Sequence, residues 1–201
     1  MSLSRVCVLV AAVTVLIGSP VELLAQAARD LHAEIDLRAS AIAGDVIAWR
    51  RDLHQNPELG NREFRTAGVV AEHLRSLGFD EVRTDVAHTG VVGVLRGGRP
   101  GPVVGLRADM DALPVTELAD VPFASRVTTE YNGQQVGVMH ACGHDVHTAA
   151  LMGTASVLAG IREDLAGTVV FLFQPAEEGA PAGEEGGAEL MIAEGAVESP
   201  R

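Results

Sequence analysis

Cysteine is scarce in this sequence, and its scarcity excludes a disulfide scaffold. Only Cys7 and Cys142 occur among 201 residues, and no Cys-x-x-Cys pair is present. A structural zinc site commonly closes with four protein ligands that include such pairs. Neither a disulfide framework nor that kind of zinc site is therefore expected.

Basic residues are also few. The chain carries 15 basic against 27 acidic residues, for a net charge of −12. Nucleic-acid binding depends on clustered Lys and Arg that neutralise phosphates, so this function is excluded. A polybasic attachment to a membrane surface is excluded for the same reason. The bland interpretation of the acidity is a solvated surface.

No apolar run is long enough to span a membrane, which requires roughly 20 residues. Arg5 and the apolar run 6–17 are instead typical of a secretory signal sequence, and Ala25-Gln-Ala27 is typical of its cleavage site. We expect residues 1–27 to be removed and residues 28–201 to be periplasmic or secreted, without stable membrane insertion. An uncleaved anchor is the alternative. After cleavage Cys142 is the only thiol, so no intrachain disulfide can form.

What the sequence does have is enough apolar content for one domain with a real core, since 47% of its residues are hydrophobic. Segments with helical and strand periodicity alternate, without a repeat or an obvious linker. This alternation predicts an α/β fold. Helices are expected at 28–54, 62–77 (capped by Asn61), 144–158 and 188–194, and strands at 81–87, 90–95, 103–106, 136–139 and 167–173.

The stretch His140-Ala-Cys-Gly-His-Asp-Val-His147 concentrates the chain's metal-capable side chains. It is one of three polar clusters that follow apolar strands; the other two contain Asp109 with Asp111 and Glu177 with Glu178. Ligands bind outside the carboxyl ends of strands in open α/β sheets. If the strands are parallel neighbours, the three clusters meet at one edge.

Cys, His and carboxylate side chains form the ligand set that zinc prefers. In an extended segment Cys142 and His144 would point the same way and reach one metal ion. One carboxylate of the Glu177–Glu178 pair can bind metal while its neighbour accepts a proton from water. A Cys142 nucleophile activated by a histidine is the competing chemistry. His140 and His147 carry weaker signals, and His54 carries no clear mechanism.

Four ordered motifs carry a family resemblance. They are Arg51-Asp-Leu-His-Gln-Asn-Pro-Glu-Leu-Gly60, Leu106-Arg-Ala-Asp-Met-Asp-Ala-Leu-Pro114, His140-Ala-Cys-Gly-His-Asp145 and Phe173-Gln-Pro-Ala-Glu-Glu-Gly179. From about Ile35 onward the chain resembles the amidohydrolase subfamily of the aminoacylase and carboxypeptidase-type metallopeptidases, which includes hippurate hydrolase, N-acyl-amino-acid amidohydrolases and auxin-conjugate hydrolases. The fold implied is a three-layer α/β catalytic domain with a mixed, mainly parallel sheet.

The resemblance also implies roles for individual residues. Cys142, His144 and Glu178 would bind a pair of divalent metal ions, zinc or manganese, with cobalt or nickel as alternatives. Glu177 would be the general base, and Asp111 would support the metal-binding region. Asp109 stands where many relatives have a metal-binding histidine. Substrates would be N-acyl or N-aroyl amino acids such as hippurate; dipeptidase or carboxypeptidase activity is the nearest alternative.

Such enzymes are roughly twice as long as this chain. The resemblance implies that they add a domain for homodimerisation and further metal-binding histidines, whereas no histidine follows His147 here. We therefore expect residues 28–201 to be the N-terminal part of the catalytic domain, with exposed apolar sheet edges. We also expect weak metal binding and low hydrolysis by this chain alone. A chain that binds metal or a partner without catalysis is a further alternative.

Overall fold

The computed structural model describes residues 20–198, and the chain divides into two units, residues 1–34 and 35–201. Helix α1 (Pro20–Gln55) begins in the first unit and ends in the second. The expected signal run 6–17 lies outside the described residues, so the signal sequence stays a prediction. Among the helices of residues 20–198, none combines the length and the apolar character that a membrane span needs.

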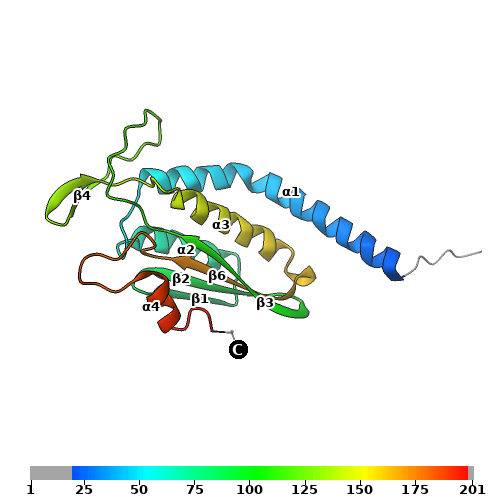
Figure 1. The fold of residues 1–201 in the computed structure, drawn as a ribbon. Coiled ribbons are helices and arrows are strands. Elements are labelled where there is room, and N and C mark those ends of the chain that lie inside the picture. Colours follow the sequence, from blue (N-terminus) through cyan, green and yellow to red (C-terminus); the bar gives the residue numbers. More distant parts are fainter. Residues whose placement is uncertain (1–19, 199–201) are drawn as a thin grey trace, which may run out of the picture. The chain divides into compact units, whose positions relative to one another are not determined.

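A four-stranded sheet forms the centre of the second unit (Figure 1). Its strands are β1 (Glu81–Val86), β2 (Gly90–Arg96), β3 (Arg99–Asp109) and β6 (Ala166–Gln174), in the order β1-β2-β6-β3. The β3/β6 pair is parallel, whereas β1/β2 and β2/β6 are antiparallel. The sheet is mixed, as expected, but the expectation of a mainly parallel sheet is wrong for these strands.

Connection length explains the strand directions. A three-residue turn joins β1 to β2, and so short a turn can only produce an antiparallel pair. Between β3 and β6 the chain instead passes through helix α3 (His144–Gly160), the crossover that a parallel pair requires.

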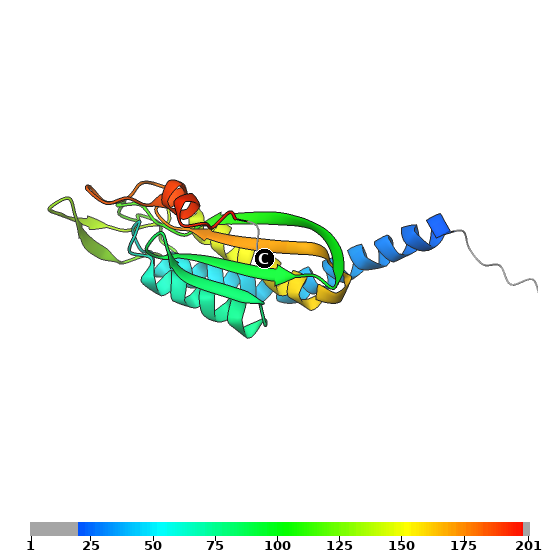
Figure 2. The same ribbon diagram turned by 90° about the horizontal axis from the view of Figure 1, so that it is seen from below.

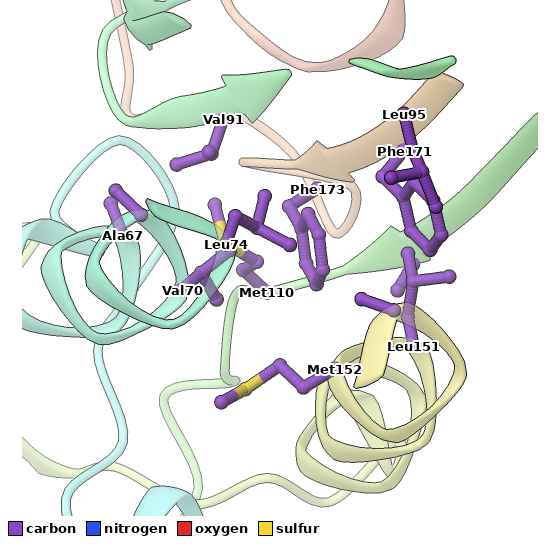
Figure 3. Packing of buried hydrophobic residues seen from close by; sticks show 13 residues of the cluster. Ala67, Val70, Leu74, Val91, Leu95, Met110, Leu151, Met152, Phe171 and Phe173 are labelled. Atoms are coloured by element: carbon purple, nitrogen blue, oxygen red, sulfur yellow. The ribbon is translucent and has the colours of Figure 1, made fainter. Parts of the chain in front are cut away.

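Helices cover both faces of the sheet, which gives the expected three layers (Figure 2). Helices α2 (Phe64–Ser76) and α3 lie on one face, and the short helix α4 (Gly187–Ala193) lies on the other. The main core lies between α2, α3 and the sheet, where Leu74, Met152, Phe171 and Phe173 are almost fully buried (Figure 3).

One local expectation is wrong, and another has shifted bounds. Asn61 does not cap α2; the helix begins at Phe64, and the Asn61 amide instead donates to the backbone oxygen of Glu185 at 2.9 Å. The expected strand 136–139 is β5 (Gln134–Gly137), which pairs with β4 (Thr128–Tyr131) in a separate two-stranded sheet. The sequence pattern predicted a strand here, but it did not indicate that this strand pairs with β4.

The edge of the sheet formed by β3 is apolar and exposed, as expected. Val103 and Val104 on this strand remain 49% and 47% exposed. The opposite end of β3 is buried, because Ala108 and Asp109 lie against the polar cluster described below.

Candidate metal centre

Two of the three polar clusters leave the sheet side by side. Asp109 at the end of β3 is paired with Gln174 at the end of β6, and the Met110 amide donates to the Gln174 oxygen at 2.9 Å. Because β3 and β6 are parallel neighbours, the condition stated from the sequence is met for these two clusters, and Asp109 and Asp111 lie beside Glu177 and Glu178.

The backbone that carries the third cluster, Cys142 and His144, differs from the expected extended segment. Cys142 precedes α3 and His144 is the first residue of that helix, so the two do not share an extended segment. Gly143 between them has a φ of 87°, a left-handed conformation that glycine adopts without a steric penalty. The Thr148 hydroxyl donates to the Asp109 carbonyl oxygen at 2.8 Å and ties α3 to the end of β3.

The structure brings the three predicted metal ligands together. Cys142, His144 and Glu178 each offer one ligand atom, and these atoms lie within 4.8 Å of one another. Ligand atoms around one tetrahedral zinc ion at 2.0–2.3 Å are roughly 3.3–3.8 Å apart. A thiol, an imidazole and a carboxylate at this spacing fit a divalent cation after small side-chain movements.

Asp111 connects two members of this group. Its carboxylate and its backbone oxygen accept from His144 Nδ1 at 3.0 and 2.9 Å. Its other carboxylate oxygen accepts from the Glu178 amide at 2.9 Å. These contacts engage Nδ1, so Nε2 is the His144 nitrogen that can bind a metal ion once its proton is displaced. Asp111 thus lies behind the site, in the supporting place that the resemblance implied.

Glu177 and Glu178 lie at similar distances from His144. His144 Nε2 is 3.7 Å from a Glu177 carboxylate oxygen and 3.9 Å from one of Glu178. Only Glu178 also lies within ligand distance of Cys142. The Glu177 side chain is the more exposed of the two, 39% against 24%. Proximity to the Cys142 thiol therefore distinguishes Glu178 from Glu177.

His147 lies closer to the site than the sequence suggested. Together with Asp109 and His144 it forms a second group of potential ligands. Its ring stacks on that of His144, with centroids 5.4 Å apart, because residues three apart share one side of a helix. Both groups of potential ligands include His144. Because Asp111 engages its Nδ1, His144 has one other ring nitrogen, Nε2, to offer to a metal ion.

Neighbouring carboxylates raise the pKa values of His144 and Cys142, two of the three predicted metal ligands. Hydrogen bonding to Asp111 raises the pKa of His144 to about 9, against the opposing effect of burial. A hydrogen bond to Glu178 raises the pKa of the Cys142 thiol. A divalent ion binds the deprotonated forms, so it must displace protons here.

Two other histidines lie behind the site. His140 is buried, which lowers its pKa to about 4, and within residues 20–198 neither of its ring nitrogens has a hydrogen-bond partner. His54 contacts Asp145 in the first turn of α3 at 2.8 Å and Glu117 at 3.1 Å. The motif 51–60 contained His54, but only the fold reveals these partners.

Glu63 is a buried carboxyl group that the sequence did not single out. Its two oxygens accept from the Ala176 amide at 2.8 Å and from the Thr89 hydroxyl. Burial raises the pKa of Glu63 to about 7, although these hydrogen bonds oppose the shift.

This raised pKa predicts a pH-dependent stability. The folded chain holds the Glu63 proton more tightly than the unfolded chain, whose value is 4.5, so the stabilisation is complete below pH 4.5 and is lost as the pH rises through about 7. Glu63→Gln cannot ionise. At about 1.4 kcal/mol per pKa unit, we expect its free energy of unfolding to gain ~3 kcal/mol on wild type between pH 4 and pH 8. Urea unfolding measures this difference; a constant difference across that range would contradict the prediction.

Comparison with known proteins identifies the family. Residues 105–201 match the model of Peptidase family M20/M25/M40. The chain is 46% identical to the N-acyl-L-amino acid amidohydrolase of Geobacillus stearothermophilus, over 82% of this chain and 41% of that protein. It is 47% identical to thermostable carboxypeptidase 2 of Saccharolobus solfataricus, over 84% of this chain and 40% of that protein. The chain thus spans about two fifths of the length of these curated relatives.

A solved structure similar to this chain belongs to the same family as these relatives. The YXEP protein of Bacillus subtilis, described as a dinuclear metal binding peptidase, is 41% identical and superposes with a TM-score of 0.68 over 79% of this chain and 41% of that chain. The resemblance inferred from the four motifs and the mixed α/β fold are thereby confirmed. This chain belongs to Peptidase family M20/M25/M40, a family of hydrolases that act on amide and peptide bonds.

Proposed function

We propose that this chain carries the metal-binding part of an amidohydrolase that cleaves N-acyl amino acids. The observation that carries the proposal is the meeting of Cys142, His144 and Glu178 at the carboxyl ends of β3 and β6. The similarity to an N-acyl-L-amino acid amidohydrolase supports this substrate class. The similarity to a carboxypeptidase makes peptides with a free carboxyl terminus the second class to test.

In this proposal Cys142, His144 and Glu178 hold the metal, and Asp111 keeps His144 Nδ1 protonated. A bound divalent ion would polarise the scissile carbonyl and lower the pKa of water. Glu177 accepts a proton from the attacking water as the oxygen adds to the carbonyl carbon. The C–N bond then breaks, and the proton passes to the leaving amine, which gives a carboxylate and an amine.

Two ions per site are part of the proposal, supported by the description of the YXEP relative. Asp109 and His147 extend the ligand group beyond the first three residues. Zinc suits a thiolate and imidazoles, while manganese, cobalt and nickel are alternatives, because geometry rather than raw affinity decides which metal binds.

A cleft of about 570 Å³ next to Glu178 offers room for the acyl group. Its apolar lining includes Leu113 and Pro114 and, from the β4–β5 hairpin, Tyr131. The lining is mixed, since Arg62 and Glu130 also contribute to it, and such a cleft suits a substrate that carries both an apolar acyl group and a polar amide.

Hydrolysis tests the proposal directly. The purified chain is incubated with hippurate, N-acetyl amino acids and dipeptides, with and without added Zn²⁺ or Mn²⁺, and amine release is measured. We expect slow, metal-dependent release from the N-acyl amino acids that stops with a chelator. Release that survives the chelator and is lost with iodoacetamide would instead assign a thiol hydrolase. Release at the rate of full-length relatives would overturn the expected low activity of the chain alone.

A further inference from the structure

The turn that carries Glu177 and Glu178 is held at two backbone amides. The Ala176 amide donates to Glu63 at 2.8 Å, and the Glu178 amide donates to Asp111 at 2.9 Å. Glu177 lies between these two anchored residues. A buried backbone N–H group needs an acceptor, so the side-chain oxygens of Glu63 and Asp111 fix the positions of these two amides.

Ala176 adopts a backbone conformation that needs such support. Its φ is 47°, in the left-handed region that residues other than glycine rarely adopt. A conformation of this kind persists only where its surroundings determine it. The buried Glu63 carboxyl is one such determinant, since it is 0% exposed and its second oxygen is fixed by Thr89.

The segment that carries Glu63 contacts both loops of the site. A Cβ on Gly60 would meet the Gly179 oxygen at 2.8 Å and the Ala176 Cα at 3.1 Å, so only glycine allows this approach. The Ala112 amide donates to the Glu58 oxygen at 2.8 Å, which ties the same segment to the loop after β3. Residues 58–63 therefore lie against both the Asp111 loop and the Glu177–Glu178 turn.

We propose that Glu63 is a positioning residue for the metal centre. By fixing the Ala176 amide, its side chain sets the direction in which Glu177 and Glu178 leave β6, and so places the Glu178 carboxylate beside Cys142 and His144. Asp111 performs the matching task from the other side, because it holds the Glu178 amide and His144 together. The expected effect of Glu63 on metal binding rests on the proposed function, whereas the hydrogen bond between Glu63 and the Ala176 amide does not.

Co²⁺ binding by three Glu63 variants tests the proposal. Glu63→Ala removes the acceptor, and Glu63→Asp withdraws it by one methylene. Glu63→Gln keeps an oxygen for Ala176 and an amide for the Thr89 hydroxyl. Loss of a group that orients a metal ligand typically weakens metal binding by 10–100-fold. We expect a loss of at least about 10-fold for the Ala and Asp variants, with a weakened Co²⁺–thiolate absorption band, and near wild-type binding for Gln.

Glu58→Ala is the matched control. Glu58 also accepts two backbone N–H groups, those of Arg65 and Thr66 at 2.9 and 2.8 Å, but they belong to the start of α2. Removal of this side chain should destabilise α2 and leave the Co²⁺ affinity unchanged, because the Glu58 backbone oxygen that accepts from Ala112 is kept. If Glu58→Ala lost as much Co²⁺ affinity as Glu63→Ala, the effect of Glu63 would be explained by lower stability alone, and the proposal would be overturned.

Hydrogen exchange keeps the test independent of metal binding. If the wild-type chain binds no Co²⁺, the proposed function fails, but exchange at the Ala176 amide still tests the contact. We expect at least about 10-fold faster exchange at Ala176 in Glu63→Asp, with unchanged exchange in the core of β6. Wild-type Co²⁺ affinity and absorption in a folded Glu63→Asp variant would overturn the positioning role, as would unchanged protection of Ala176.

Discussion

Replacing Cys142 with alanine is expected to weaken Zn²⁺ or Co²⁺ binding by more than about 100-fold. The loss of a direct ligand should exceed the 10–100-fold effect of losing a group that only orients one. The Cys142 side chain is exposed, so its truncation leaves no cavity and should change the free energy of unfolding little. Isothermal titration measures the affinity, and the Co²⁺–thiolate absorption band should disappear.

The chain supplies its own control for this substitution. Cys7 is the only other cysteine, and it lies outside the described residues. In the full chain, Cys7→Ala should bind Co²⁺ with wild-type affinity and keep the thiolate band. Bound metal should also slow the reaction of Cys142 with iodoacetamide. Equal affinity in Cys142→Ala and wild type would remove the thiol from the metal site and favour the cysteine nucleophile.

The neighbouring carboxylates are expected to separate into a metal ligand and a base. Glu178 forms a group of potential ligands with Cys142 and His144, whereas Glu177 lies 3.7 Å from His144 but is in neither group. We expect Glu178→Gln to lower metal affinity by at least about 10-fold. Glu177→Gln should keep the affinity and reduce hydrolysis by about 10²–10⁴-fold, the range that general acid–base catalysis contributes.

The two substitutions control for each other, because they are chemically identical and adjacent in one turn. Metal titration distinguishes them even at low turnover, and amine release from an N-acetyl amino acid measures the catalytic loss. The reverse pattern, with metal lost in Glu177→Gln and kept in Glu178→Gln, would exchange the two assignments. Equal metal loss in both would show that the pair binds metal jointly, without a separate base.

The sequence was sufficient for the helices and strands with clear periodicity. The apolar run of β6 and the helix that follows His144 appear close to their expected bounds, since local patterning dominates there. The sequence placed Asp109, Asp111, Glu177 and Glu178 together only on the condition that their strands are parallel neighbours, and the structure supplies that condition in the β3/β6 pair. That argument fails for Cys142, because the strand before it, β5, belongs to a separate sheet. The expected extended segment from Cys142 to His144 is also wrong, since Gly143 turns the chain there into α3.

By itself, then, the sequence determined the α/β class, the family and the residue types of the candidate metal centre, because strand periodicity and contiguous motifs are local properties. Only the tertiary structure decided how the centre is supported. Glu63 meets Ala176 across 113 positions, and Asp111 meets Glu178 across 67. Such contacts leave no mark on local periodicity, since they depend on how β3, β6 and α2 pack together. The tertiary structure also decided that β5 pairs with β4 in a second sheet and not with the strands of the main sheet.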